Sequence, residues 1–148
     1  MQQEQGVVTA VFTMEHYDSA FALWRGCDGI GLTDADSREG IERFLRRNPG
    51  MSRVALDNGR LVGTVLAGDD GRRGYLHHLA VHPDHRRRGL GQRLLAEAVV
   101  ALRAATNKKC HGFVFRKNLE GLDFWRSAGW KVREDIALIS LDIPPKPE

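Results

Sequence analysis

With 148 residues, 42% of them hydrophobic and 28% charged, the chain has the balance of one folded domain spanning residues 1–148 and not of a disordered protein. Its apolar runs stay short of the roughly 20 residues that span a bilayer, and the first residues do not resemble a secretory signal, so we expect a cytoplasmic protein with no membrane partner. Its two cysteines fit neither a disulfide framework nor a metal site, so we expect no metal. The net charge of +3 is compatible with binding of nucleic acid, of an anionic cofactor or of neither, so only the location of the charges can distinguish these possibilities.

The first third of the chain predicts a strand followed by two amphipathic helices. A run of β-branched residues favours the strand, and apolar residues at helical spacing favour the helices. A loop rich in glycine and aspartate separates the two helices. These elements are a strand at 7–13, a helix at 14–27, the loop at 28–36 and a helix at 37–47.

The remainder predicts a hairpin, a third strand, and then alternating helices and strands. The pair Asn58-Gly59 favours a tight type I′ turn between the first two of these strands. The expected elements are strands at 52–56, 61–67, 74–81 and 110–115, helices at 89–105 and 118–128, one or two closing strands within 130–143, and a flexible tail at 144–148. This order predicts an α/β fold with a mixed, mostly antiparallel sheet and helices on both faces.

The segment from Val81 to Leu94 carries the clearest chemical signal. A strand ends there, a basic turn follows, and glycines open a long helix, whose first backbone N–H groups and dipole favour an anion. Glycine lets a phosphate approach the backbone, and arginine supplies forked donors to phosphate oxygens. We call residues 86–92 the phosphate loop: Arg86, Arg87, Arg88, Gly89, Leu90, Gly91 and Gln92.

Other phosphate motifs do not fit this segment. A Walker A loop needs Gly-Lys followed by Ser or Thr, which is absent. A dinucleotide fingerprint needs a third glycine where Leu94 stands, and it needs an early βαβ unit. The alternative is a basic surface turn that caps an ordinary helix and binds nothing. The agreement among the arginines, the glycines and the strand–helix order argues against this alternative.

The spacing Arg86, two residues, Gly89, one residue, Gly91 resembles the signature of the GNAT family of N-acetyltransferases, and the order of the flanking elements is similar over nearly the whole chain. The resemblance implies acetyl-CoA as acyl donor and a fold in which the strand before the signature splays from the next one. It implies that the phosphate loop binds the CoA pyrophosphate. It further implies that the backbone of Leu79, Ala80 and Val81 binds pantetheine, with the Leu79 N–H as oxyanion donor.

The second part of the resemblance lies in residues 116–130, where Asn118 matches a residue that contacts pantetheine. Asn118 is equally suited to cap the helix that follows. The family's tyrosine, the acid that protonates the leaving thiolate, is replaced here by Trp125, whose indole N–H has no useful acidity. We expect Trp125 either to line the cofactor slot or to pack in the core.

A base must accept the proton of the attacking amine. The candidates on the strand at 74–81 are Tyr75, His77 and His78. The two histidines are favoured because imidazole titrates near neutral pH, and His111 is a weaker candidate. A water chain to a carboxylate is an equal alternative.

The resemblance places the acceptor near the early helices and their loop, where aspartates favour a cationic amine. These are Asp28, Asp34 and Asp36, and Glu39 follows them. The resemblance therefore implies an amine acceptor, either a small molecule or the N-terminus or lysine of a protein, and a possible homodimer through the closing strands or helices. A solvated loop with a helix-capping aspartate is the alternative.

Two other functions stay open at this point. A non-catalytic acyl-CoA-binding module would share the phosphate loop and differ only in chemistry. A nucleic-acid-binding domain would use the arginine run, but Glu97 interrupts the basic face of the following helix and no nucleic-acid motif is present. We therefore expect no nucleic-acid partner.

Overall fold

The computed structural model describes residues 6–147, and these divide into two compact units, one up to Phe115 and one from Arg116 onward. Each unit is described by itself, and the single-domain organisation stays a prediction. The first unit contains β1 (Val7–Val11), α1 (Tyr17–Arg25), α2 (Arg38–Arg47), β2 (Arg53–Asp57), β3 (Arg60–Asp69), β4 (Gly74–Val81), α3 (Leu90–Ala104) and β5 (Cys110–Gly112), together with the short 3-10 turns η1 (Met14–His16), η2 (Asp34–Asp36) and η3 (Pro83–His85). The second contains α4 (Leu119–Ser127).

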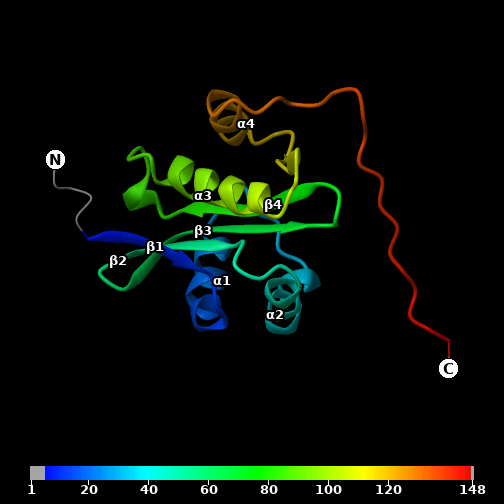
Figure 1. The fold of residues 1–148 in the computed structure, drawn as a ribbon, viewed down its shortest axis with the longest axis horizontal. Helices are drawn as coiled ribbons and strands as arrows, with labels where there is room; N and C mark the ends of the chain where they lie inside the picture. Colours follow the sequence, from blue (N-terminus) through cyan, green and yellow to red (C-terminus); the bar gives the residue numbers. More distant parts are fainter. Residues whose placement is uncertain (1–5, 148) are drawn as a thin grey trace. The chain divides into compact units, whose positions relative to one another are not determined.

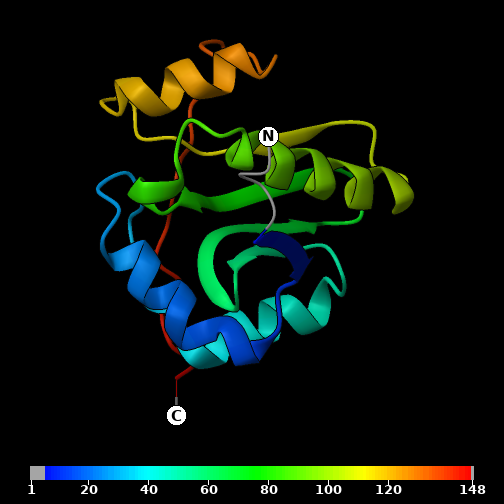
Figure 2. The same cartoon turned by 90° about the vertical axis from the view of Figure 1, so that its left-hand side faces the viewer.

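The strands form one sheet in chain order, β1-β2-β3-β4-β5 (Figure 1). The first four strands are antiparallel to their neighbours, and β5 runs parallel to β4. Helices α1 and α2 cover one face of the sheet and α3 covers the other (Figure 2). The predicted α/β class, with a mixed, mostly antiparallel sheet and helices on both faces, is therefore confirmed.

The β2–β3 hairpin turns as its sequence predicts. Asn58 and Gly59 both have positive φ, 52° and 84°, which a type I′ turn requires at its two central positions. Asp57 and Arg60 face each other across this turn. The segment that follows β4 stays beside the hairpin, because the backbone N–H of His82 donates to the carbonyl of Val62 near the start of β3 (2.8 Å).

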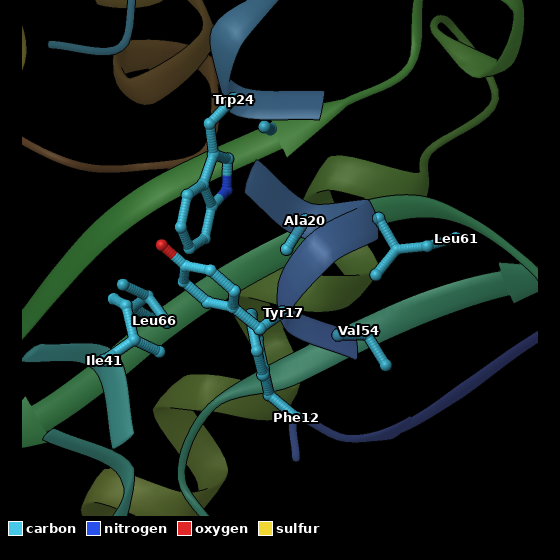
Figure 3. Packing of buried hydrophobic residues seen from close by; sticks show 9 residues of the cluster. Phe12, Tyr17, Ala20, Trp24, Ile41, Val54, Leu61 and Leu66 are labelled. Carbon is cyan, nitrogen blue, oxygen red and sulfur yellow. The ribbon is translucent and has the colours of Figure 1, made fainter. Parts of the chain in front are cut away.

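A buried hydrophobic cluster joins α1 and α2 to the sheet (Figure 3). Trp24 is fully buried, and its indole N–H donates to the Thr64 hydroxyl on β3 (2.9 Å). The Thr64 hydroxyl in turn donates to the backbone carbonyl of His78 on β4 (2.8 Å). These two hydrogen bonds satisfy the buried polar side-chain atoms of Trp24 and Thr64, and they tie α1 to the middle of β4.

Strands β4 and β5 pair only at their beginnings. The parallel ladder covers Gly74–Leu76 against Cys110–Gly112, so β5 is shorter than the predicted strand at 110–115. Beyond Leu76, residues 77–81 of β4 have no partner strand on that side in the part of the chain that the structure describes. The expected divergence of these two strands is thus present.

The closing strands predicted within 130–143 are wrong, because no strand is assigned between residues 130 and 147. A strand exists only where a second strand satisfies its backbone groups, and β-branched and alternating apolar residues alone do not supply one. The apolar side chains of this segment are correspondingly exposed, for example Leu138 at 77% and Ile139 at 89%. A homodimer through paired closing strands loses this support and stays a prediction.

No helix within residues 6–147 combines the length and the apolar character needed to cross a membrane.

Candidate functional site

The phosphate loop leaves η3 and runs into the N-terminus of α3 through two residues in the left-handed region. Arg87 has φ of 63° and Gly89, which caps the helix, has φ of 78°. A Cβ built on Gly89 would meet no atom within 4 Å, so the space beside this backbone is open. The first N–H groups of a helix have no partner within it and favour an anion. The open backbone beside Gly89 at the start of α3 is therefore compatible with a bound phosphate.

The three arginines of the loop do not act alike. Arg86 turns back toward β4, where its Nε donates to the carbonyl of Val81 (2.9 Å). Its guanidinium also lies beside Cys27: burial raises the pKa of that thiol, and Arg86 works in the opposite direction. Arg87 and Arg88 are exposed. Arg86 thus has a contact within the protein, and the other two have side chains open to solvent.

A β-bulge shapes the middle of β4, where the candidate residues Leu79, Ala80 and Val81 begin. Across the β3–β4 ladder Thr64 faces Ala80 and Leu66 faces His77, so His78 and Leu79 together stand opposite one residue of β3. His78 takes a positive φ of 51°, which is uncommon for a residue other than glycine. The bulge lies on the stretch of β4 that β5 does not pair, so the backbone groups of Leu79 and Val81 on that side have no β5 partner.

His78 is held in an ion-pair geometry that the sequence did not indicate. Its Nε2 lies 2.7 Å from Oδ1 of Asp36, and the Trp24 ring packs edge-on against the imidazole with centroids 4.7 Å apart. Asp36 is 7% exposed, and its other oxygen accepts from the Thr33 backbone N–H (3.0 Å). Tyr17 donates to the Asp36 carbonyl (2.6 Å). Asp36 is therefore buried against β4, whereas Asp28 and Asp34 of the same loop are exposed.

His77 lies between two aromatic rings. Phe113, just beyond β5, stacks on the imidazole with centroids 5.5 Å apart and planes 5° apart, and Phe44 of α2 meets it edge-on at 6.1 Å. Burial lowers the pKa of His77, and the neighbouring His78 lowers it further, against a smaller opposite effect of Asp36. The ring is therefore neutral near pH 7 and able to accept a proton. His111, the weaker candidate, packs instead against Tyr75 with centroids 5.7 Å apart.

The remaining predicted residues lie in the second unit. The Asn118 side chain accepts from the Gly121 backbone N–H (3.0 Å), so its role as the N-cap of α4 is confirmed. Trp125 packs edge-on against Trp130 with centroids 4.6 Å apart, and the backbone N–H of Trp130 donates to the backbone carbonyl of Trp125 (3.0 Å). These contacts describe a packed aromatic pair at the end of α4. Their part in cofactor binding stays a prediction.

The expectation of no metal site stays an expectation. Residues 6–147 contain no group of three or more histidine, cysteine or acidic side chains placed to hold a metal ion.

Comparison with protein families gives a match over most of the chain. The profile of the acetyltransferase (GNAT) family matches residues 17–130. An acetyltransferase of Pectobacterium atrosepticum is 35% identical over 73% of this chain and 76% of the relative. An acetyltransferase of Yersinia pestis is 30% identical over 86% of this chain and 90% of the relative.

Solved structures with the same fold include proteins captured with CoA. The PaiA N-acetyltransferase of Thermoplasma acidophilum in complex with coenzyme A has a TM-score of 0.73 at 17% identity, over 88% of this chain and 92% of that one. The aminoglycoside N-acetyltransferase AAC(6')-Iy in complex with CoA has a TM-score of 0.71 at 17% identity, over 93% and 95%. The NatC complex bound to Gag peptide and CoA has a TM-score of 0.71 at 17% identity, over 82% of each chain.

Proposed function

Because the chain belongs to the GNAT family of acetyltransferases and is an acyl-CoA-dependent N-acetyltransferase, we propose that it transfers the acetyl group of acetyl-CoA directly to a primary amine within a ternary complex. The observation that carries the proposal is the phosphate loop at the start of α3, where Arg87 and Gly89 are left-handed and the space beside Gly89 is open. It lies directly after the stretch of β4 that has parted from β5. An open strand edge, on β4, is therefore followed in the chain by a helix N-terminus suited to an anion, that of α3.

In this proposal the CoA pyrophosphate binds the backbone N–H groups of residues 87–92. The first N–H groups of α3 have no partner within the helix, and the helix dipole adds partial positive charge there. Arg87 and Arg88 add charge at the rim, whereas Arg86 braces the loop against β4. The pantetheine arm would then lie along Leu79, Ala80 and Val81, whose strand edge lacks a β5 partner.

The transition state of the transfer carries negative charge on the former thioester oxygen. We assign its stabilisation to the backbone N–H of Leu79, which belongs to the bulge and is therefore held by the Thr64 contact to the adjacent carbonyl. Preorganisation of this kind is worth roughly a hundredfold or more in rate when a single donor is removed. Since only proline removes a backbone N–H, and proline within β4 would also disturb the strand, its contribution is tested through Thr64.

We assign the general base to His77 in preference to His78. A base has to be neutral before it reacts, and burial keeps His77 in that form. His78 has one ring nitrogen engaged by Asp36 and its ring packed against Trp24, which suits a residue that fixes the bulge. His77 accepts the ammonium proton, and the neutral amine nitrogen then attacks the acetyl carbon. The carbon–sulfur bond breaks, and the second proton of the attacking nitrogen passes through solvent to the departing thiolate, so that the products are the amide and the CoA thiol.

The proposed acceptor of the acetyl group is a primary amine of a small molecule or of a peptide. The similar structures include one aminoglycoside N-acetyltransferase and one complex bound to a peptide, so both kinds of acceptor occur on this fold. Asp28 and Asp34, exposed on the loop between α1 and α2, favour a cationic substrate near that loop. Asn118 and Trp125 stay in the proposal as further contacts to CoA.

The test is release of free thiol from acetyl-CoA in the presence of a panel of amines: aminoglycosides, polyamines and peptides with free N-termini or lysines. Turnover with one amine class and none without amine would support direct transfer. Hydrolysis at the same rate with and without every amine would contradict it.

A further inference from the structure

A hydrogen bond from a buried histidine joins the β2–β3 hairpin to the turn from which the phosphate loop departs. Nε2 of His85, the last residue of η3, lies 2.8 Å from Oδ2 of Asp57, the last residue of β2. The His85 side chain is 9% exposed and that of Asp57 is 31% exposed. The two residues are 28 positions apart, so the contact is made by the fold and not by local geometry.

The Asp57 carboxylate is confined on both sides. One oxygen faces His85, and a Cβ built on Gly6 would lie 2.6 Å from the other. Arg60, across the turn from Asp57, makes a second and exposed contact with the His82 ring (3.3 Å). The two ends of η3 are thus each held by one side of the hairpin turn.

The chemistry of the pair indicates what His85 contributes. A carboxylate only accepts hydrogen bonds, so Nε2 carries the proton in this contact. The other ring nitrogen, Nδ1, is buried and has no hydrogen-bond partner in the described part of the chain. A phenylalanine would fill the same space without that unsatisfied atom, so the bond to Asp57 is the property that distinguishes histidine here.

The residues after His85 need support of this kind. Arg87 takes a left-handed φ of 63° that costs energy for a side chain other than glycine, so its conformation has to be imposed by its surroundings. On one side the loop continues into α3, whose first residue, Leu90, is buried. On the other side the fixed points are Arg86, whose Nε donates to the Val81 carbonyl, and His85, which precedes it.

We propose that Asp57 and His85 are positioning residues that lock the phosphate loop in its CoA-binding conformation. This inference rests on the proposed binding of CoA by that loop. Loss of the pair lets the turn move against the hairpin, and the N–H groups of residues 87–92 then spend less time aligned on one anion. The pair acts on binding and not on the chemical step.

The test compares Asp57→Leu, Asp57→Asn and His85→Phe with the wild type, by calorimetric Kd for CoA and by steady-state kinetics. Asp57→Leu and His85→Phe are expected to raise Kd and the KM for acetyl-CoA about tenfold, the effect of losing a hydrogen bond to a charged group, and to leave kcat within about twofold. Asp57→Asn retains an acceptor for Nε2–H and restores most of the affinity.

Asp69→Leu is the matched control. Asp69 stands at the other end of β3, where it accepts from the Asn107 amide (2.7 Å), so its loss removes a comparable carboxylate contact far from the phosphate loop along the strand. It is expected to lower the melting temperature and leave Kd unchanged. Equal loss of CoA affinity in Asp69→Leu and Asp57→Leu, or wild-type affinity in Asp57→Leu and His85→Phe, would overturn the inference.

Hydrogen exchange without any ligand separates this inference from the proposed function. The amides of residues 86–92 are expected to exchange faster in Asp57→Leu and His85→Phe than in Asp69→Leu. If the wild type bound no CoA, the proposed function would fail while faster exchange still showed that the pair holds the loop. Unchanged exchange of these amides would refute the role of the pair whether or not CoA binds.

Discussion

His77 and Phe113 stack with their ring planes 5° apart, although they come from β4 and from the segment after β5. This contact removes water from one face of the imidazole, and Phe44 covers a second side. The result is a histidine whose pKa is lowered chiefly by burial, on the same strand as the bulge. An aromatic enclosure of this kind yields a base that is neutral over the physiological range.

His77→Gln is expected to lower kcat about a hundredfold or more, the typical contribution of a general base, with little change in the Kd for CoA. For the wild type, kcat/KM should rise with pH along a limb whose pKa is below the ordinary histidine value, since only the neutral ring accepts the proton. The measurement is a pH–rate profile of both proteins. A limb that persists unchanged in His77→Gln would assign the base to another group.

The same pKa shift predicts how stability depends on pH. An unfolded chain protonates His77 near pH 6.5, whereas the folded chain resists protonation until lower pH, so the unfolded state binds more protons below about pH 6.5. The contribution of His77 to the free energy of unfolding is therefore full above that pH and is lost as the pH falls. Urea unfolding at pH 5 and pH 8 should show a smaller loss in His77→Leu than in the wild type. Equal losses would contradict the burial argument.

Thr64→Val tests the hydrogen-bond chain through the core. Valine has the same shape, but it leaves the buried Trp24 N–H without an acceptor and the His78 carbonyl without this donor. We expect a loss of about 1–3 kcal/mol in the free energy of unfolding, and a fall in kcat as the bulge relaxes. Thr64→Ser keeps the hydroxyl and is the control. If valine and serine variants turned over equally, the bulge would not depend on this contact.

Trp125→Tyr tests whether position 125 can supply the general acid that protonates the leaving thiolate. A phenol can protonate a leaving thiolate and an indole cannot, so kcat should rise while the Kd for CoA stays similar. Trp125→Phe supplies the control, because it changes the packing against Trp130 without adding an acid. Equal kcat in the tyrosine and phenylalanine variants would show that position 125 is not the site of proton transfer.

The parts of the fold that depend on local chemistry were predictable from sequence. β4 has the bounds predicted from its residues, Gly74–Val81, and Asn58-Gly59 makes the expected turn. The phosphate loop was likewise visible, because glycine and arginine spacing at a helix start is a local pattern. The conformation of each of these elements is determined by residues that are close to one another in the sequence.

The parts that depend on distant partners were not predictable. Asp36 pairs with His78 across 42 positions and Asp57 with His85 across 28, and no spacing in the sequence marks either pair. The closing strands failed for the same reason. Residues 136–143 have the composition of a strand, but a strand also needs a partner, which composition does not supply.

The central claim is that the phosphate loop binds the CoA pyrophosphate, and calorimetric titration of the wild type, Gly89→Asp and Gly89→Asn with acetyl-CoA tests it most directly. A Cβ at Gly89 meets nothing within 4 Å, and both side chains tolerate its positive φ comparatively well, so both variants are expected to fold. They differ in charge alone, and a carboxylate against the pyrophosphate should abolish binding where the amide only weakens it. Binding by the wild type, weaker binding by Gly89→Asn and none by Gly89→Asp, with adenine dinucleotides inert, is the predicted result. No heat with the wild type, or equal affinity in Gly89→Asp and the wild type, would contradict the account.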